Sequence, residues 1–157
     1  MRKYIFIFSL AFMIGCDPHR IYEENIDFPD RVWHIDSIPE FEFRIDESTI
    51  NYDLIFNIRN AIDYPNHNIY FTYFLSSEDE GMLKSELVNF DLFNRKTGKP
   101  KGSGLGDIFD HQIILIENYK FDKPGLYKLG YKQYMRTDTL QGILSVGMRL
   151  VKSTEDQ

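Results

Sequence analysis

The sequence predicts an all-β fold, an antiparallel β-sandwich of about seven to eight strands that follows a signal peptide and a short tether. Apolar and polar residues alternate in one run after another from residue 40 to residue 152, and this period of two is typical of half-buried strands. Turn-forming residues separate the runs roughly every ten residues, as in a sandwich. Aromatic residues make up 15% of the chain, which suits strands with large buried faces. The sequence lacks the apolar stripe of an amphipathic helix.

The chain begins with a short apolar segment. Arg2 and Lys3 are followed by uncharged residues from Tyr4 to Gly15. A helix over residues 5–15 spans about 16 Å, roughly half of the hydrocarbon core of a bilayer. This length and the positive start are those of a signal peptide rather than of a membrane-spanning anchor. We therefore expect residues 1–15 to be a lipoprotein signal peptide that is removed.

The chain's single cysteine, Cys16, follows this segment directly. The stretch Met13-Ile14-Gly15-Cys16 resembles the bacterial lipobox, in which the cysteine is acylated with fatty acids such as palmitate. The alternative, an ordinary buried cysteine behind an uncleaved helix, leaves that helix without a second segment to pack against. Because more than one acyl chain gives lasting attachment, we expect lipidated Cys16 to hold the protein on a membrane of the cell envelope, the outer membrane rather than the inner.

The remaining chain divides into three predicted parts. Residues 16–36 are polar, contain two prolines and show no period, so we expect a lipidated N-terminus and tether that joins the domain near Trp33. The β-sandwich domain is predicted over residues 37–152. Residues 153–157 are a polar tail.

Seven runs are predicted as strands. The run HQIILIE, residues 111–117, is apolar on both faces, which indicates a central strand. In the other six runs, apolar residues share one face: Phe41, Phe43 and Ile45; Tyr52, Leu54, Phe56 and Ile58; Ile69, Phe71, Tyr73 and Leu75; Val88, Phe90 and Leu92; Tyr127, Leu129, Tyr131 and Met135; and Leu144, Val146, Met148 and Leu150.

Charge limits the classes of partner. Residues 1–15 contain two cations and no acid, so their removal changes the net charge from −6 to −8. An acidic chain is a poor candidate for binding nucleic acid or for electrostatic docking on anionic lipid. We therefore expect no nucleic-acid partner.

The glycine-rich stretch RKTGKPKGSGLGDIFDH, residues 95–111, is the strongest candidate for site chemistry. Gly102, Gly104 and Gly106 suggest a phosphate loop, but the stretch has no Gly-Lys-Ser/Thr ending and a strand pattern follows it instead of a helix. Asp107, Asp110 and His111 could bind a metal ion or act as an acid–base pair, although an EF-hand spacing is absent. We prefer turn and capping roles for the two aspartates, and we expect no metal and no cofactor.

Enzymatic activity has little support in the sequence. No serine lies in a Gly-x-Ser-x-Gly motif, and the single cysteine is predicted to be acylated. A pair of carboxylates for glycoside cleavage stays an open alternative, since such a pair needs closeness in space rather than in sequence. We expect no catalytic residues. The main alternative is a lipid-anchored carbohydrate-binding module, because exposed aromatic side chains on a sandwich can stack on sugar rings.

Several stretches in order resemble one family. They are CDPHRIYEE, VWHIDSIPEFEFRI, NIRNAIDYPNHNIYF, KGSGLGDIFD and KPGLYKLGYKQYMRTDTLQGILSVGMRL, and together they look like the GldH gliding-motility lipoproteins of the Bacteroidota. The resemblance implies a non-enzymatic accessory of the gliding machinery, linked to type IX secretion, with other envelope proteins as partners. The positions that match the most recognisable stretches are Asn57, Arg59, Asn60, Asp63, Tyr64, Pro65, Gly104, Gly106, Asp107 and Asp110.

Two loops are the leading candidates for contact with a partner. Loops on a rigid sandwich are where binding residues concentrate, and the loop over residues 102–111 has few apolar side chains to hold it in the core. The predicted interaction residues in this loop and in the turn over residues 63–66 are Asp63, Tyr64, Pro65, Gly104, Gly106, Asp107 and Asp110.

Overall fold

The computed structural model describes residues 18–154. The predicted signal peptide, Cys16 and the last three residues of the polar tail lie outside this range. All regular structure in the described range is β-strand, with no helix between residues 18 and 154, which confirms the all-β prediction. The strands are β1 (Arg20–Asp27), β2 (Val32–His34), β3 (Glu40–Ile45), β4 (Tyr52–Ala61), β5 (Asn68–Ser77), β6 (Gly81–Asp91), β7 (Ser103–Leu105), β8 (Ile108–Tyr119), β9 (Gly125–Gln133), β10 (Thr139–Gln141) and β11 (Ile143–Lys152).

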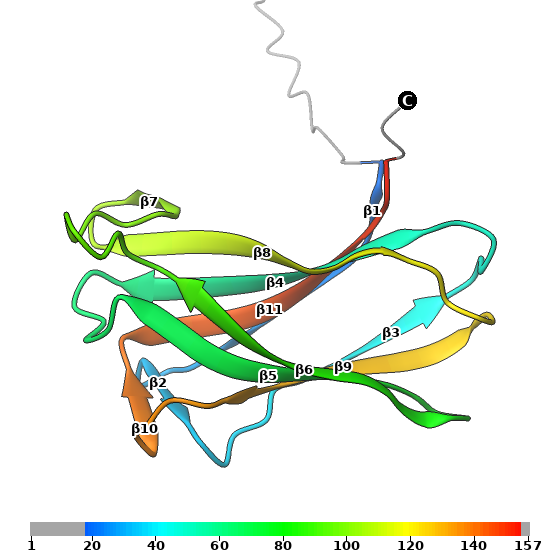
Figure 1. The fold of residues 1–157 in the computed structure, drawn as a ribbon, viewed down its shortest axis with the longest axis horizontal. Helices are drawn as coiled ribbons and strands as arrows, with labels where there is room; N and C mark the ends of the chain where they lie inside the picture. The colour runs from blue at the N-terminus through cyan, green and yellow to red at the C-terminus, as the bar shows by residue number, and fades with distance from the viewer. Residues whose placement is uncertain (1–17, 155–157) are drawn as a thin grey trace, which may run out of the picture.

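Two antiparallel sheets form the layers of the sandwich (Figure 1). One sheet has the strand order β1-β11-β4-β8-β7, and the other has the order β3-β9-β5-β6. The short strands β2 and β10 pair with each other at one end of the layers. Every pairing between strands is antiparallel.

The core lies between the two sheets and is largely aromatic. Phe56 of β4 stacks on Phe71 of β5 with 4.2 Å between ring centroids, and it meets the edge of Tyr131 of β9 at 4.6 Å. The alternating residues predicted for the inner faces of β3, β4 and β5 are all buried. Successive side chains of a strand point to opposite faces, so the period of two in the sequence correctly identified the core face of these strands.

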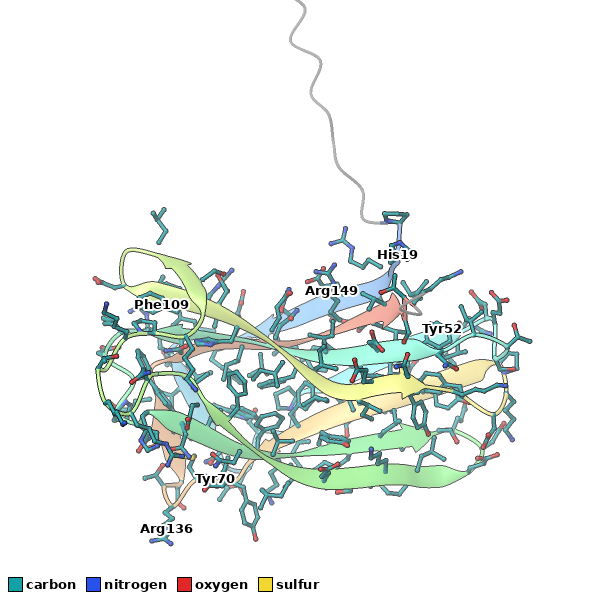
Figure 2. The ribbon with its side chains drawn as sticks, turned by 45° about the horizontal axis from the view of Figure 1, so that its top comes forward. His19, Tyr52, Tyr70, Phe109, Arg136 and Arg149 are labelled. Carbon is teal, nitrogen blue, oxygen red and sulfur yellow. The ribbon has the colours of Figure 1, made fainter. Side chains whose placement is uncertain are left out.

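The two ends of the sandwich are distinct. β4 runs from Tyr52 to Ala61, and its antiparallel neighbours place Lys152 and Tyr119 beside Tyr52. In Figure 2, Tyr52 and His19 lie toward one end of the molecule, and Phe109 lies toward the other. We call the first the proximal end, marked by His19, Tyr52, Tyr119 and Lys152, and the second the distal end, marked by Ala61, Ile108 and Ile143.

The prediction of a tether over residues 16–36 is wrong for Arg20–Asp27, which form strand β1. β1 pairs with β11 from Arg20 opposite Val151 to Asp27 opposite Ser145. It is an edge strand, so only its inner face and one edge contact the protein. Because its residues are half-buried or exposed throughout, its sequence shows no clear alternation.

Trp33 belongs to the core rather than to a tether junction. Its side chain is 0% exposed, stacks on Phe28 at 5.8 Å between centroids, and donates a hydrogen bond from Nε1 to the carbonyl oxygen of Ser37 at 3.0 Å. The folded unit therefore includes residues from β1 onward and does not begin at residue 37.

The expectation that residues 111–117 form a central strand is also wrong. β8 pairs with β4 on one side, but on the other side it pairs only with the three residues of β7. Most of β8 is therefore an edge, and Ile114 is 55% exposed on its outer face.

β11 carries a register shift between Ile143 and Ser145, so Ile143 is buried where the pattern had placed Leu144.

Candidate functional site

The two loops predicted to contact a partner lie together at the distal end. The loop over residues 62–67 connects β4 to β5, and β7 and β8 form a hairpin in which Leu105 pairs with Ile108. The backbone N–H of Ile62 donates to the carbonyl oxygen of Asp107 at 2.8 Å. The two loops therefore form one connected surface, which the sequence alone did not predict.

The β7–β8 hairpin has a defined backbone. Gly106 and Asp107 are the two central residues of its turn, and Gly106 has a φ of 68°. Positive φ at the first central residue alone is the pattern of a type II′ hairpin turn, which favours glycine there. A Cβ atom at Gly104 would lie 2.2 Å from the carbonyl oxygen of Ile108. Both glycines thus have conformational or packing roles.

The residues predicted in the other loop have unequal roles. Tyr64 is buried, donates a hydrogen bond to the carbonyl oxygen of Asn68 at 2.9 Å, and stacks on Phe93 at 6.4 Å. It therefore fixes the loop from within. Asp63 and Pro65 beside it are exposed and available to a partner.

The most exposed apolar side chain of this surface is one that the sequence analysis did not select. Leu105, at the turn of the β7–β8 hairpin, is 94% exposed. Ile62, in the neighbouring loop, is also exposed. The alternation around Leu105 is too short to assign its face, but a lone leucine between glycines was a usable signal.

Asp110 lies on the outer face of the five-stranded sheet and pairs with Arg59. The Arg59 Nε atom donates to Asp110 Oδ1 at 2.7 Å, and this hydrogen bond raises the pKa of Arg59. Both side chains are half exposed. An exposed pair of this kind contributes about 0.2–1 kcal/mol to folding. A partner could therefore bind Asp110 at little cost in stability.

The pair lines a polar groove of about 430 Å³ on that outer face. Register places Asn25, Gly147, Asn57 and Gln112 in one row across β1, β11, β4 and β8. Asn57 Nδ2 donates to Glu23 at 3.2 Å, while Asn57 Oδ1 is buried without a hydrogen-bond partner. The groove therefore presents amide and carboxylate groups.

His111 points the opposite way from Asp110, into the core. Its Nε2 atom lies 2.9 Å from Oδ1 of the buried Asn60, whose Nδ2 donates to the carbonyl oxygen of Ala61, so Nε2 is the donor of this hydrogen bond. Burial lowers the pKa of His111, and the nearby Asp110 acts against this shift. Because adjacent strand residues face opposite sides, Asp110 and His111 do not converge. Within residues 18–154 no group of three or more His, Cys, Asp or Glu side chains is placed to hold a metal ion.

A second, apolar depression of about 490 Å³ lies near the distal end, beside the four-stranded sheet. Tyr70 and Tyr134 in its lining are 38% and 62% exposed, and Figure 2 shows Tyr70 and Arg136 in the same region of the molecule. The full lining is Asn66, Tyr70, Leu87, Tyr134, Met135, Arg136 and Thr137. Asn66 belongs to the loop over residues 62–67, so this depression adjoins the connected loop surface.

Comparison with known proteins identifies the family. A family model described as "GldH lipoprotein" matches residues 20–150. This chain belongs to the GldH lipoprotein family. The gliding motility lipoprotein GldH homolog of Christiangramia forsetii is 36% identical over 160 aligned positions, which cover 96% of this chain and 94% of that protein. The gliding motility lipoprotein GldH of Flavobacterium johnsoniae is 28% identical, with 93% of each chain covered.

Membership in the GldH family bears on the activity and on the location of the protein. The family is one of lipoproteins and is not a known enzyme family. A lipoprotein family implies lipid-anchored association with the cell envelope. No helix among the described residues is long and apolar enough to cross a membrane. The matched range begins at β1, in agreement with a folded unit that includes this strand.

Proposed function

We propose that this GldH-family protein is a lipid-anchored, non-enzymatic accessory of the bacterial gliding machinery, linked to type IX secretion, and that its distal end binds another envelope protein. The relatives named above are gliding motility lipoproteins, which supports the cellular process. The observation that carries the binding role is Leu105, an almost fully exposed leucine on a hairpin whose backbone is fixed.

Leaving the Leu105 side chain in water has a cost in free energy. Burying a leucine side chain fully contributes about 1.5–3 kcal/mol relative to exposure. The hairpin and the loop over residues 62–67 are joined by the Ile62–Asp107 hydrogen bond, so binding orders little new backbone, and the entropy cost of association is reduced. Asp63, Asp107 and Asp110 add exposed polar groups to the same connected surface, and an apolar centre with a polar rim is the usual arrangement of an interface.

The anchor in this proposal is Cys16, which is acylated and becomes the first residue when residues 1–15 are removed. Mass spectrometry of the mature N-terminal peptide should find an acylated cysteine as the first residue. A free thiol at Cys16, or a retained Met1, would contradict the anchor. We propose the outer membrane as the membrane concerned.

The contact is tested by comparing Leu105→Ser with Met82→Ser. Met82 is also an exposed apolar residue, but it lies at the start of β6, at the proximal end. Affinity isolation of the detergent-extracted protein should recover the partner with Met82→Ser but not with Leu105→Ser. Gliding should likewise be kept with Met82→Ser and lost with Leu105→Ser. Retention of both partner and gliding by Leu105→Ser would contradict the proposal.

The depression at Tyr70 and Tyr134 favours one second candidate, a carbohydrate-binding module. Two exposed tyrosines beside Asn66 and Arg136 offer ring faces and polar groups to a sugar. Tyr134→Ala should then abolish binding of the pure domain to a polysaccharide while Leu105→Ser leaves it unchanged. Buried Trp33 takes no part in such a platform.

A further inference from the structure

The described chain is fixed almost from its first residue. β1 pairs with β11 along its length, and the backbone N–H of Lys152 donates to the carbonyl oxygen of His19 at 2.9 Å. His19 is therefore held at the proximal end by the sheet.

Cys16 precedes His19 by three residues. An extended chain spans at most about 3.6 Å per residue, so the Cα atoms of these two residues are separated by no more than about 11 Å. An acylated cysteine places its fatty acids in the bilayer and itself at the level of the headgroups. The proximal end is thus within roughly the thickness of a headgroup layer of the lipid.

We propose that the proximal end of the sandwich rests on the lipid headgroups, and that the distal end, with the Leu105 hairpin, faces away from the membrane. This inference rests on the proposed lipidation of Cys16. It replaces a domain on the predicted tether over residues 16–36 with a domain seated on the bilayer. The segments toward the lipid are the β3–β4 loop over residues 46–51, the β5–β6 turn over residues 78–80 and the β8–β9 loop over residues 120–124.

The length of the strands sets the reach of the distal end. β4 has ten residues, and a strand rises about 3.3 Å per residue. In the proposed orientation, the hairpin and the loop over residues 62–67 therefore stand about 30 Å above the proximal loops. A partner that binds there must project to this height from the same membrane or approach it from the other side.

Charge attracts neither the outer face of the five-stranded sheet nor the proximal end to anionic lipid, so the short connection to Cys16 carries this inference. The outer face of that sheet carries the acidic lining residues Glu23, Asp27 and Asp110 against Arg59, and anionic lipid repels acidic groups. At the proximal end, cations are paired with acids: Lys152 lies 3.9 Å from Glu47, and Lys123 lies 2.9 Å from Glu80. The proximal loops carry six acids against two cations: Asp46, Glu47, Glu78, Asp79, Glu80 and Asp122 against Lys120 and Lys123. The proximal end is therefore acidic as well, and in this inference the acyl chains alone hold it to the bilayer.

The test uses the full lipidated protein in vesicles that contain a lipid with a nitroxide-labelled headgroup. A fluorophore is attached to Thr49→Cys in the β3–β4 loop, to Ile114→Cys on the outer sheet face, or to Leu105→Cys at the hairpin. Strong quenching at position 49 with little at positions 114 and 105 is the expected result. Equal quenching at 114 and 49 would show a flat domain, and no quenching at 49 would show a raised one; either result overturns the inference.

A spacer variant and a flotation control separate this inference from the anchor itself. Ten Gly/Ser residues inserted after Asp17 should abolish quenching at position 49 while the protein still floats with the vesicles. If the original protein fails to float, or if its Cys16 is unmodified, the proposed lipidation has failed. If it floats and position 49 is unquenched, the anchor stands and the seated orientation is wrong.

Discussion

At the scale of single residues, burial rather than residue type decides which polar side chains are available for binding. Asp110 and His111 are neighbours in sequence, yet the first pairs with Arg59 on the surface and the second with Asn60 in the core. Tyr64 was predicted as a contact residue and instead supports its loop from inside. A sequence pattern can select such polar residues as candidates for a site. It cannot say which of them face solvent near a turn, because the alternation that assigns faces within a strand stops there.

His111 should make folding stability depend on pH. Burial lowers the pKa of His111 below the ordinary 6.5, so below pH 6.5 the unfolded chain takes up a proton that the folded chain does not. The free energy of unfolding therefore decreases as the pH falls from 6.5 toward the lowered pKa of His111 in the folded state. Urea unfolding between pH 7 and pH 5 should show a smaller loss of stability for His111→Gln than for the original protein. A similar flattening in His67→Gln, which changes a half-exposed histidine, would contradict this assignment.

The aspartates of the hairpin should matter for binding more than for folding. Asp107→Ala with Asp110→Ala removes a half-exposed ion pair and one turn side chain, so we expect a loss of no more than about 1 kcal/mol in the free energy of unfolding. Partner recovery and gliding should weaken. Thermal unfolding of the double variant measures its stability, and affinity isolation measures its partner recovery. A variant that unfolds would show that the aspartates are structural.

At the scale of elements, the sequence pattern predicted seven strands, β3, β4, β5, β6, β8, β9 and β11, and missed four, β1, β2, β7 and β10. β3, β4 and β5 bury one complete face, so their alternation is strong. β1 lies at a sheet edge and β2, β7 and β10 have three residues each, too few for a period to be visible. The exposed Ile114 shows the converse, because apolar residues on both faces of β8 suggested a central strand where the structure has an edge.

The N-terminal strands should be required for folding. A fragment over residues 37–152 lacks β1 and the buried Trp33, and loss of a buried aromatic side chain alone costs about 3–5 kcal/mol. We expect this fragment to be unfolded or non-cooperative, and a fragment over residues 18–154 to unfold in one cooperative transition. Circular dichroism with urea titration compares the two. Equal stability of the shorter fragment would show that β1 and β2 are dispensable.

At the scale of the whole molecule, the sandwich is one core with two different ends. Phe56 lies at the centre, between Phe71 and Tyr131 of the opposite sheet. Phe56→Ala should lower the free energy of unfolding by about 3–5 kcal/mol, while Leu105→Ser should change it by less than about 0.5 kcal/mol. Denaturant unfolding measures both. A large loss for Leu105→Ser would indicate that the hairpin supports the core.

The distal surface lies apart from the core, and we propose that it binds an envelope protein. Site-specific photocrosslinking in gliding cells tests it most directly, with the photoreactive residue at position 105 and, as the matched control, at position 82. We expect a discrete crosslinked product from position 105, absent from position 82 and identifiable by mass spectrometry as an envelope protein. Products from position 82 alone, or from neither position, would contradict the claim.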